Sequence, residues 1–337
     1  MNIRHRLIAT TIWFVFSVNA YAHHGWAPHF DGNDVVSIEG RITRFEFVNP
    51  HSFVYVDVTN DAGEVVTHWC EMQARSQLQR KGIGAAQFKV GSTIAIEGFR
   101  SKRDPVGCEL GFSRFHDGTE LRLRELDGRG VFQAPLVEGD NSIIGTWYPE
   151  EFISEAGSEQ DSQASLTPDG RAAHNAFDWL TQNPTLHCSP ASNIRAWAAP
   201  GLPTSIEREN GQIRIRHEFM DAERVIYLDS SERASGQQRT DLGYSVGRFE
   251  DSALIIETTG FAAGALWAGR LNTEGLETTE KLWVDPATGL LVLEWTATDP
   301  AYYSAVESGR RTFVRTDLSI GNFECDSDAG HTPIAVE

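Results

Sequence analysis

The stretch VVSIEGRITRFEFVNPHSFVYVDVT, residues 35–59, decides the fold of the first half of the chain. Its β-branched and aromatic residues form two segments separated by Asn49-Pro50, which predicts two antiparallel strands joined by a turn. The apolar phase of the first segment shifts midway along it. We therefore expect a β-bulge near Thr43 and Arg44.

The residues that follow extend this pattern into a small domain. A third strand is predicted over 64–71 and a short helix over 73–81, with Gly82 ending the helix. Further strands are predicted over 93–99, 108–115 and 120–126. Three strands, a helix and then more strands is the order of an OB-type Greek-key barrel. A pleckstrin-like or sandwich arrangement uses the same order and stays open.

The second half predicts another β domain, larger than the first. Asn210-Gly211 is a strong tight-turn signal, and short strands recur at regular spacing, which favours an antiparallel barrel or sandwich. One helix is expected over 171–181, and residues 154–165 are expected to form a mobile loop. The predicted strands are 212–219, 222–229, 243–249, 253–260, 276–284, 290–298 and 310–319.

The chain begins with the features of a secretory signal peptide. Arg4 and Arg6 precede an apolar run over 7–18, and Ala20-Tyr21-Ala22 supplies the small residues of a cleavage site. We expect a protein of the periplasm or one that is secreted. The predicted organisation is a signal peptide over 1–22, an OB-like domain over 23–127, a Gly/Pro-containing linker over 128–142, an antiparallel barrel over 143–326 and a disordered tail over 327–337.

The charge excludes some partners. The formal net charge is −18, and removal of Arg4 and Arg6 makes it −18 − 2 = −20. Such a chain has no basic run that could neutralise phosphates, so nucleic acid is not an expected partner. No stretch after the signal peptide is apolar enough to span a bilayer.

Four cysteines in an oxidising compartment predict disulfides. We expect Cys188 to pair with Cys325, because closing so long a loop would restrain the unfolded second domain. Cys70 is expected to pair with Cys108 in the first domain.

The strongest chemical feature is the mature N-terminus. Cleavage after Ala22 would make His23 the first residue, with His24 directly behind it. The α-amine and imidazole of an N-terminal histidine can both be deprotonated near neutral pH and can chelate one metal ion. A third nitrogen from His51 would complete a planar set that suits Cu(II). His68 and His116 are reserve ligands. The alternative is a solvated N-terminus, with His51 hydrogen-bonded within its own turn.

Two other patterns suggest chemistry. His68, Cys70 and Met72 share one face of a predicted strand and are soft ligands of the kind found in copper electron-transfer sites, but this interpretation requires Cys70 to be a free thiolate. Residues 243–247 match the G-x-S-x-G pattern around Ser245. A nucleophile elbow needs a helix after the serine, whereas the sequence here predicts strands.

Gly145-Thr146-Trp147 resembles the G-x-W start of lipocalin-type barrels. Lipocalin-type barrels hold an apolar ligand when side chains do not fill their interior. The nine tryptophans in the chain could line such a site. The alternative is that these tryptophans are ordinary core residues.

The N-terminal half also resembles a known family. The residues that carry the resemblance are His23-His24-Gly25-Trp26, Phe30-Asp31, Glu39-Gly40, Asn49-Pro50-His51, Trp69 with Glu71, and Arg80 to Gly82. They are similar to an exported bacterial family classed as a domain of unknown function, whose mature chains begin His-His-Ser-Phe and carry an Asn-Pro-His turn. The resemblance covers residues 23–126 and implies a secreted β fold. This sequence departs from the pattern at Gly25, where serine is usual, and at Ile83, where tryptophan is usual.

The second half resembles another uncharacterised exported β domain, which implies no reaction. Its matching motifs are Cys188-Ser189-Pro190, Pro200-Gly201-Leu202-Pro203, Tyr227-Leu228-Asp229, Gly243 to Phe249 and Asp299-Pro300.

These observations predict a periplasmic binding protein that holds copper through His23, His24 and His51, with a second barrel for an apolar ligand or an envelope partner. The alternative is an envelope enzyme, either a copper oxygenase or a metal-free hydrolase or lyase in the second barrel. A purely structural module is the third possibility.

Overall fold

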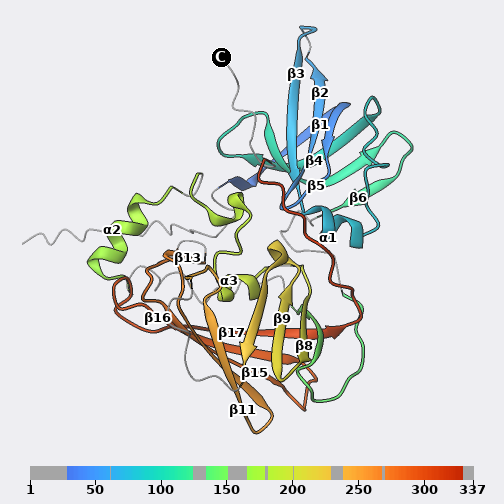
Figure 1. Cartoon of the computed structure of the whole chain (residues 1–337). Helices are drawn as coiled ribbons and strands as arrows, with labels where there is room; N and C mark the ends of the chain where they lie inside the picture. Colours follow the sequence, from blue (N-terminus) through green and yellow to red (C-terminus); the bar gives the residue numbers. More distant parts are fainter. Residues whose placement is uncertain are drawn as a thin grey trace, which may run out of the picture.

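The computed structural model is built mainly from β-strands, which form two bodies (Figure 1). The residues that it describes are 29–60, 62–123, 134–150, 165–178, 181–199, 201–228, 238–267 and 270–328. The predicted signal peptide, His23, His24 and the 154–164 part of the predicted loop lie outside the described residues. So do 124–127 of the predicted OB-like domain, 128–133 of the predicted linker and 329–337 of the predicted tail.

The first body holds six strands and one helix. They are β1 (Phe30–Glu46), β2 (Ser52–Thr59), β3 (Val65–Met72), α1 (Arg75–Arg80), β4 (Thr93–Ser101), β5 (Gly107–Phe115) and β6 (Glu120–Arg122). The strands pair in the order β3-β2-β1-β4-β5-β6, and an additional parallel pairing joins β3 to β5. Strands β1 to β5 therefore form a closed ring. Helix α1 lies between β3 and β4 in the sequence. This is the strand order of the predicted OB-type barrel.

Local sequence signals explain how this ring forms. The register of β1 against β2 shifts between Ile42 and Arg44, which confirms the predicted bulge. Inward-facing apolar residues such as Val54, Val56 and Ile96 form the core, each at most 1% exposed. Helix α1 ends where Gly82 adopts a φ of +74°, a conformation that glycine tolerates without steric cost.

The second body contains a closed barrel of nine strands. In spatial order they are β10 (Glu223–Tyr227), β11 (Tyr244–Glu250), β12 (Ala253–Thr259), β15 (Glu277–Val284), β16 (Leu291–Thr298), β17 (Glu307–Thr316), β7 (Gly145–Pro149), β8 (Thr204–Glu209) and β9 (Gln212–His217). A separate hairpin joins β13 (Gly264–Trp267) to β14 (Arg270–Asn272). The short helical segments are α2 (Pro168–Ala176), η2 (Pro184–His187), α3 (Asn193–Trp197) and η3 (Phe219–Asp221).

Trp147 lies on β7 in the core of the second barrel and is fully buried. Its indole N–H donates to the carbonyl of Ile143 at 2.8 Å, and the Arg315 guanidinium lies 4.3 Å from its ring centroid. Arg315 also donates to the carbonyls of Ile144 and Ser142. The cation over the indole face and these hydrogen bonds hold the first and last strands of the barrel together.

A polar cluster lies inside the same barrel. Glu280 is fully buried and accepts hydrogen bonds from Arg224 at 2.6 Å, from the Trp197 indole at 2.7 Å and from Asn193 at 2.9 Å. Trp197 and Asn193 belong to α3, so this helix is tied to the barrel interior. Because a buried carboxylate is stable only when its lone pairs are satisfied, the cluster specifies where α3 docks.

Both predicted disulfides are confirmed. Cys70 is bonded to Cys108 between β3 and β5, and Cys188 is bonded to Cys325. Disulfides fit an oxidising compartment outside the cytoplasm. Among the helices in the described ranges, none is long and apolar enough to cross a membrane.

Some predictions for the second domain were wrong. The helix expected over 171–181 is α2, Pro168–Ala176, and it is not the domain's one helix, since α3 is also present. Strands β10 and β11 pair in parallel, although an antiparallel meander was expected. Strand β8 was not predicted, because it is short and begins among loop-forming residues. Strand β7 begins at Gly145, where the G-x-W resemblance places the start of the barrel.

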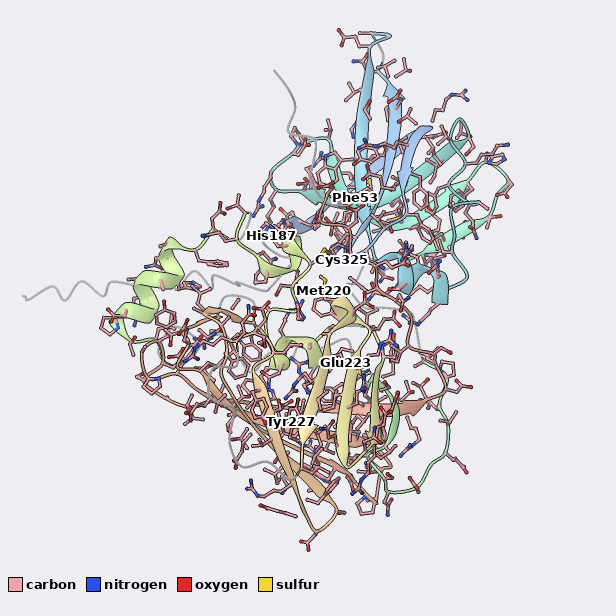
Figure 2. The ribbon with its side chains drawn as sticks, in the orientation of Figure 1. Phe53, His187, Met220, Glu223, Tyr227 and Cys325 are labelled. Atoms are coloured by element: carbon pink, nitrogen blue, oxygen red, sulfur yellow. A yellow bond between two sulfur atoms is a disulfide. The ribbon has the colours of Figure 1, made fainter. Side chains whose placement is uncertain are left out.

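The two bodies pack directly against each other. Six buried apolar residues form a shared cluster, from Ala74 at the start of α1 in the first domain to Phe219, Met220 and Phe323 in the second, with Ala199 and Leu202. Figure 2 shows Met220 and Cys325 between the barrels, with Phe53 above them. Arg80 of α1 also forms an ion pair with Glu218, whose side chain is fully buried.

Candidate functional site

His51 lies directly after the Asn49-Pro50 turn and immediately before β2. Along β2 and β3, Val54, Cys70 and Met72 point into the first barrel, so Phe53 and Glu71, which form a register pair, point outward. His51 is two residues from Phe53 and belongs to the same outer face. The site is therefore built on the outside of the small barrel and not in its core.

The His51 ring is held by a carboxylate. Its Nδ1 lies 2.8 Å from Oε1 of Glu71, and the His51 side chain remains 52% exposed. Burial alone would lower the pKa of His51, but the charge of Glu71, its hydrogen bond and a contact with the Met72 carbonyl raise the pKa above its usual value. The ring is thus oriented by the protein and is still accessible to a ligand.

Two more titratable groups, Glu109 and His29, lie close enough to this pair for their charges to interact with it. Glu109 is the register partner of Glu71 on β5, and its charge also raises the pKa of His51. His29 precedes β1. Its pKa is lowered by burial and then by the charge of Arg103, and it also senses the charges of Glu71 and His51. The N-terminal end of β1 therefore brings a second imidazole into the electrostatic neighbourhood of His51.

An aromatic cluster lies on the same outer face of the barrel. Phe53 and Trp69 have ring centroids 6.3 Å apart, and the Trp69 indole donates to Asp104 at 2.7 Å. Phe30, Tyr55 and Phe99 complete this cluster, and each of its five members is at most 7% exposed. Packing of this kind holds β2 and β3 rigidly beside the His51–Glu71 pair.

The structure places the predicted ligands unequally. His51 is described, whereas His23 and His24 are not. Of the reserve ligands, His68 lies on β3, and His116 is an exposed residue just after β5. Within the described ranges, no three His, Cys, Asp or Glu side chains form a group that could hold a metal ion. A metal at His51 would thus require donors from outside these ranges.

The structure excludes the two other chemical patterns, the soft-ligand copper site and the nucleophile elbow. Cys70 is in a disulfide and cannot serve as a thiolate ligand, which excludes the copper site of His68, Cys70 and Met72. Ser245 is 3% exposed, and its hydroxyl contacts Arg224 and Thr258 inside the second barrel. Strand β11 continues past Ser245, so the G-x-S-x-G match is not a nucleophile elbow.

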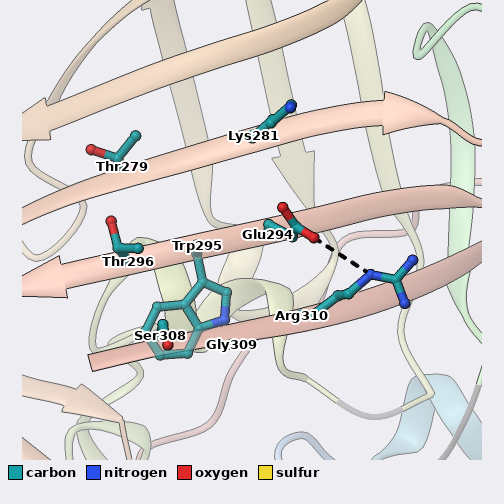
Figure 3. Close-up of a pocket in the computed structure, with 8 residues that line it drawn as sticks. All are labelled: Thr279, Lys281, Glu294, Trp295, Thr296, Ser308, Gly309 and Arg310. Carbon is teal, nitrogen blue, oxygen red and sulfur yellow. Dashed lines mark ion pairs between the residues drawn. The ribbon is translucent and has the colours of Figure 1, made fainter. Parts of the chain in front are cut away.

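A surface pocket of about 500 Å³ lies on the second barrel (Figure 3). Its lining residues are Thr279, Lys281, Glu294, Trp295, Thr296, Ser308, Gly309 and Arg310. Glu294 and Arg310 form an ion pair across it at 3.7 Å. The lining is mostly exposed polar side chains of β15, β16 and β17, and it includes none of the residues around His51.

Sequence reasoning missed Glu71 and His29 as members of the site. A signal for Glu71 was available, because β2 and β3 were both predicted and a hairpin places residues near the end of one strand opposite those near the start of the other. His29 stood out only as a histidine close behind His23, because the start of β1 was predicted five residues late, at Val35.

The fold and the site define a protein of two β-barrels, the smaller of which presents a carboxylate-bound histidine on its outer face. Residues 13–108 match the sequence profile of a family of unknown function, DUF6152. This match supports the predicted resemblance to a family of unknown function, and it includes the Asn-Pro-His turn, Glu71 and β1 to β4. No curated protein matches the chain.

Proposed function

We propose that this chain is an exported copper-binding protein whose metal is held by the α-amine and imidazole of His23 together with the ring of His51. His24, the next residue, supplies a further imidazole beside this set of three nitrogens. The observation that carries the proposal is the contact between His51 Nδ1 and Glu71. Metal-ligating histidines commonly donate one ring N–H to a carboxylate, which fixes the tautomer and leaves the other nitrogen as the ligand.

The assignment gives each group one role. Glu71 holds Nδ1, so Nε2 of His51 is the coordinating nitrogen. His23 contributes two nitrogens, and three nitrogens in one plane suit Cu(II) better than the tetrahedral preference of Zn²⁺. Glu109 adds negative charge close to the ring, which favours a bound cation.

The length of the chain permits this set of ligands. His29 is the sixth residue after His23, so the two lie within about 22 Å of each other whatever path the chain follows. His29 in turn is close enough to His51 for their charges to interact. The N-terminal histidines are therefore within reach of the His51 ring.

The compartment supports the same function. The predicted signal peptide and the two disulfides fit export to the periplasm or beyond. Cleavage after Ala22 is essential to the proposal, because only a free α-amine at His23 can chelate together with its own imidazole.

A titration with Cu(II) tests the proposal. The protein beginning at His23 is compared with the same protein acetylated at its α-amine, and a competing chelator reports the affinity. We expect acetylation to weaken binding at least 100-fold, since it removes the α-amine from the ligand set. Equal affinity of the two proteins would reject the proposed site.

The apolar ligand of the second barrel stays a prediction. The described side chains that point into this barrel, including Ile206, Ile213, Leu254, Leu282 and Leu293, belong to one buried cluster. Such packing favours a structural role for the barrel, in which it supports the first domain.

A further inference from the structure

Asn49, two residues before His51, bonds the turn that precedes His51 to the second domain. Its side chain is fully buried, its Nδ2 donates to the carbonyl of Phe323, and its Oδ1 accepts from the Ser76 backbone N–H at 3.2 Å. Its own carbonyl accepts from the Asp326 N–H at 2.8 Å, and its backbone forms a bridge with Cys325. The side chain and the backbone of Asn49 are thus both hydrogen-bonded, and these bonds fix the turn just before His51.

Residues 321–326, which we name the strap, follow the last barrel strand and provide these partners. The strap is attached to the second domain by the Asp221 carboxylate, which accepts from the N–H groups of Phe323 at 2.8 Å and Glu324 at 3.1 Å. Glu218 accepts from the Gly321 N–H at 2.9 Å. The disulfide between Cys188 and Cys325 adds a covalent attachment.

The first domain binds the strap at a second point. Arg75, the first residue of α1, donates to the Glu324 carboxylate at 2.7 Å and to the Phe323 carbonyl at 3.3 Å. Its backbone N–H donates to the carbonyl of Val48 at 3.0 Å. The turn, the helix and the strap therefore share one network of hydrogen bonds, in which the Asn49 side chain is buried and the Arg75–Glu324 pair is exposed.

From this network we infer that the second domain sets the copper affinity of the first domain. Asn49 is the positioning residue, because its hydrogen bonds to the strap fix the turn and thereby the position of His51. This inference rests on the proposed function and adds a role for the second barrel. A ligand on an unsupported turn must be ordered when metal binds, whereas a turn that is already fixed avoids that entropic cost. Removing a group that hydrogen-bonds to a metal ligand typically lowers affinity 10- to 100-fold, and Asn49, which acts on His51 through the backbone of the turn, is expected to lie at the lower end of that range.

The test uses the full chain beginning at His23 and the substitution Asn49→Asp. The new oxygen keeps the shape of the side chain but faces the Phe323 carbonyl oxygen, so the hydrogen bond is replaced by repulsion. We expect Cu(II) affinity to fall at least 10-fold. Asn60→Asp is the matched control, because Asn60 occupies an exposed turn of the same domain and donates to Glu64. This control should bind copper like the unmodified protein.

A second variant changes only the other domain. Asp221→Asn leaves one of the two strap N–H groups without its carboxylate acceptor, and we expect a several-fold loss of Cu(II) affinity. Asp285→Asn is the control, since Asp285 accepts from a turn N–H of Ala287 in the hairpin between β15 and β16. This pair keeps the inference testable if Asn49→Asp fails to fold.

A double-mutant cycle separates positioning from general damage. In a His51→Ala background, Asn49→Asp should cause no further loss of affinity, because its effect acts through His51. An equal loss in both backgrounds would overturn the inference, as would unchanged affinity in both Asn49→Asp and Asp221→Asn. If His51→Ala itself binds as tightly as the unmodified protein, the proposed site is wrong and the inference falls with it.

Discussion

The two barrels place their polar groups on opposite faces. In the second barrel Arg224 and Glu280 lie inside, with side chains 2% and 0% exposed, and Glu280 is bonded to Arg224, Trp197 and Asn193. In the first barrel His51 and Glu71 lie outside, with side chains 52% and 23% exposed. The Arg224–Glu280 pair is enclosed by the side chains that bond to it, whereas the His51 ring is accessible to a ligand.

This difference separates structural from functional polar groups. A buried carboxylate whose bonds go to the fold itself contributes to folding specificity, and its loss leaves an uncompensated charge. A half-exposed imidazole that is oriented by a carboxylate contributes little to stability, since water screens the pair. We therefore expect substitutions in the second barrel to affect stability and substitutions around His51 to affect binding.

The largest effect is expected from Glu280→Gln. The substitution keeps the shape of the side chain but leaves Arg224 buried beside a neutral group, which costs about 3–5 kcal/mol of unfolding free energy. Urea denaturation provides the measurement. Glu277→Gln on the same strand is exposed and should change stability by less than about 0.5 kcal/mol. Equal effects of the two would show that the interior cluster is not structural.

A somewhat smaller loss, about 3 kcal/mol, is expected from Arg80→Ala at the junction of the domains. It leaves the fully buried Glu218 without its cation. Arg100→Ala provides the contrast, because its pair with Asp34 is 42% and 46% exposed and is worth at most about 1 kcal/mol. Unfolding monitored by calorimetry distinguishes the two. A result in which Arg100→Ala is the more damaging would contradict the buried role of Arg80.

His217 predicts a pH dependence for the second barrel. Burial and then the charge of Arg224 lower its pKa to about 3, and its Nδ1 lies 2.9 Å from the Thr204 hydroxyl. Protonation therefore favours the unfolded chain, whose histidine has a pKa of about 6.5. The contribution of His217 is fully present above pH 6.5 and is lost as the pH falls towards 3, by a few kcal/mol at most.

Denaturant unfolding at several pH values tests this dependence. The carboxylates also titrate in this range, so the informative quantity is the difference between the unmodified protein and His217→Gln. We expect this difference to favour the unmodified protein near pH 7 and to shrink on acidification. A difference that stays constant from pH 7 to pH 4 would mean that His217 binds a proton as readily in the folded protein as in the unfolded chain, which contradicts a lowered pKa.

The smallest energetic effect is expected at the proposed site. Glu71→Gln removes the charge that orients His51, and we expect Cu(II) affinity to fall 10- to 100-fold, which corresponds to about 1.4–2.7 kcal/mol. Unfolding free energy without metal should change by less than about 1 kcal/mol. A large loss of stability with unchanged copper affinity would place Glu71 among the structural groups.

The fold of the first domain was largely predictable from local patterns. Alternation along residues 35–59 predicted β1 and β2, the phase shift predicted the bulge at Thr43 and Arg44, and Gly82 predicted the end of α1. Both disulfides followed from the number of cysteines and the expected compartment. These features depend on neighbours in sequence, so one chain is enough to recognise them.

The contacts between distant segments were not predictable in the same way. The pairing of Asn49 with Cys325 joins residues far apart in the chain, and no local pattern marks it. The parallel pairing of β10 with β11 and the docking of α3 on Glu280 likewise depend on tertiary packing. His51 was identified from its turn, but its carboxylate partner emerged only from the register of β2 with β3.

The most direct test is electron paramagnetic resonance of Cu(II) bound to the protein that begins at His23. We predict one copper per chain, with superhyperfine splitting from three nitrogen ligands. In His51→Ala the number of nitrogen ligands should fall to two. A spectrum that is identical in both proteins, or one dominated by oxygen ligands, would contradict the proposed copper site.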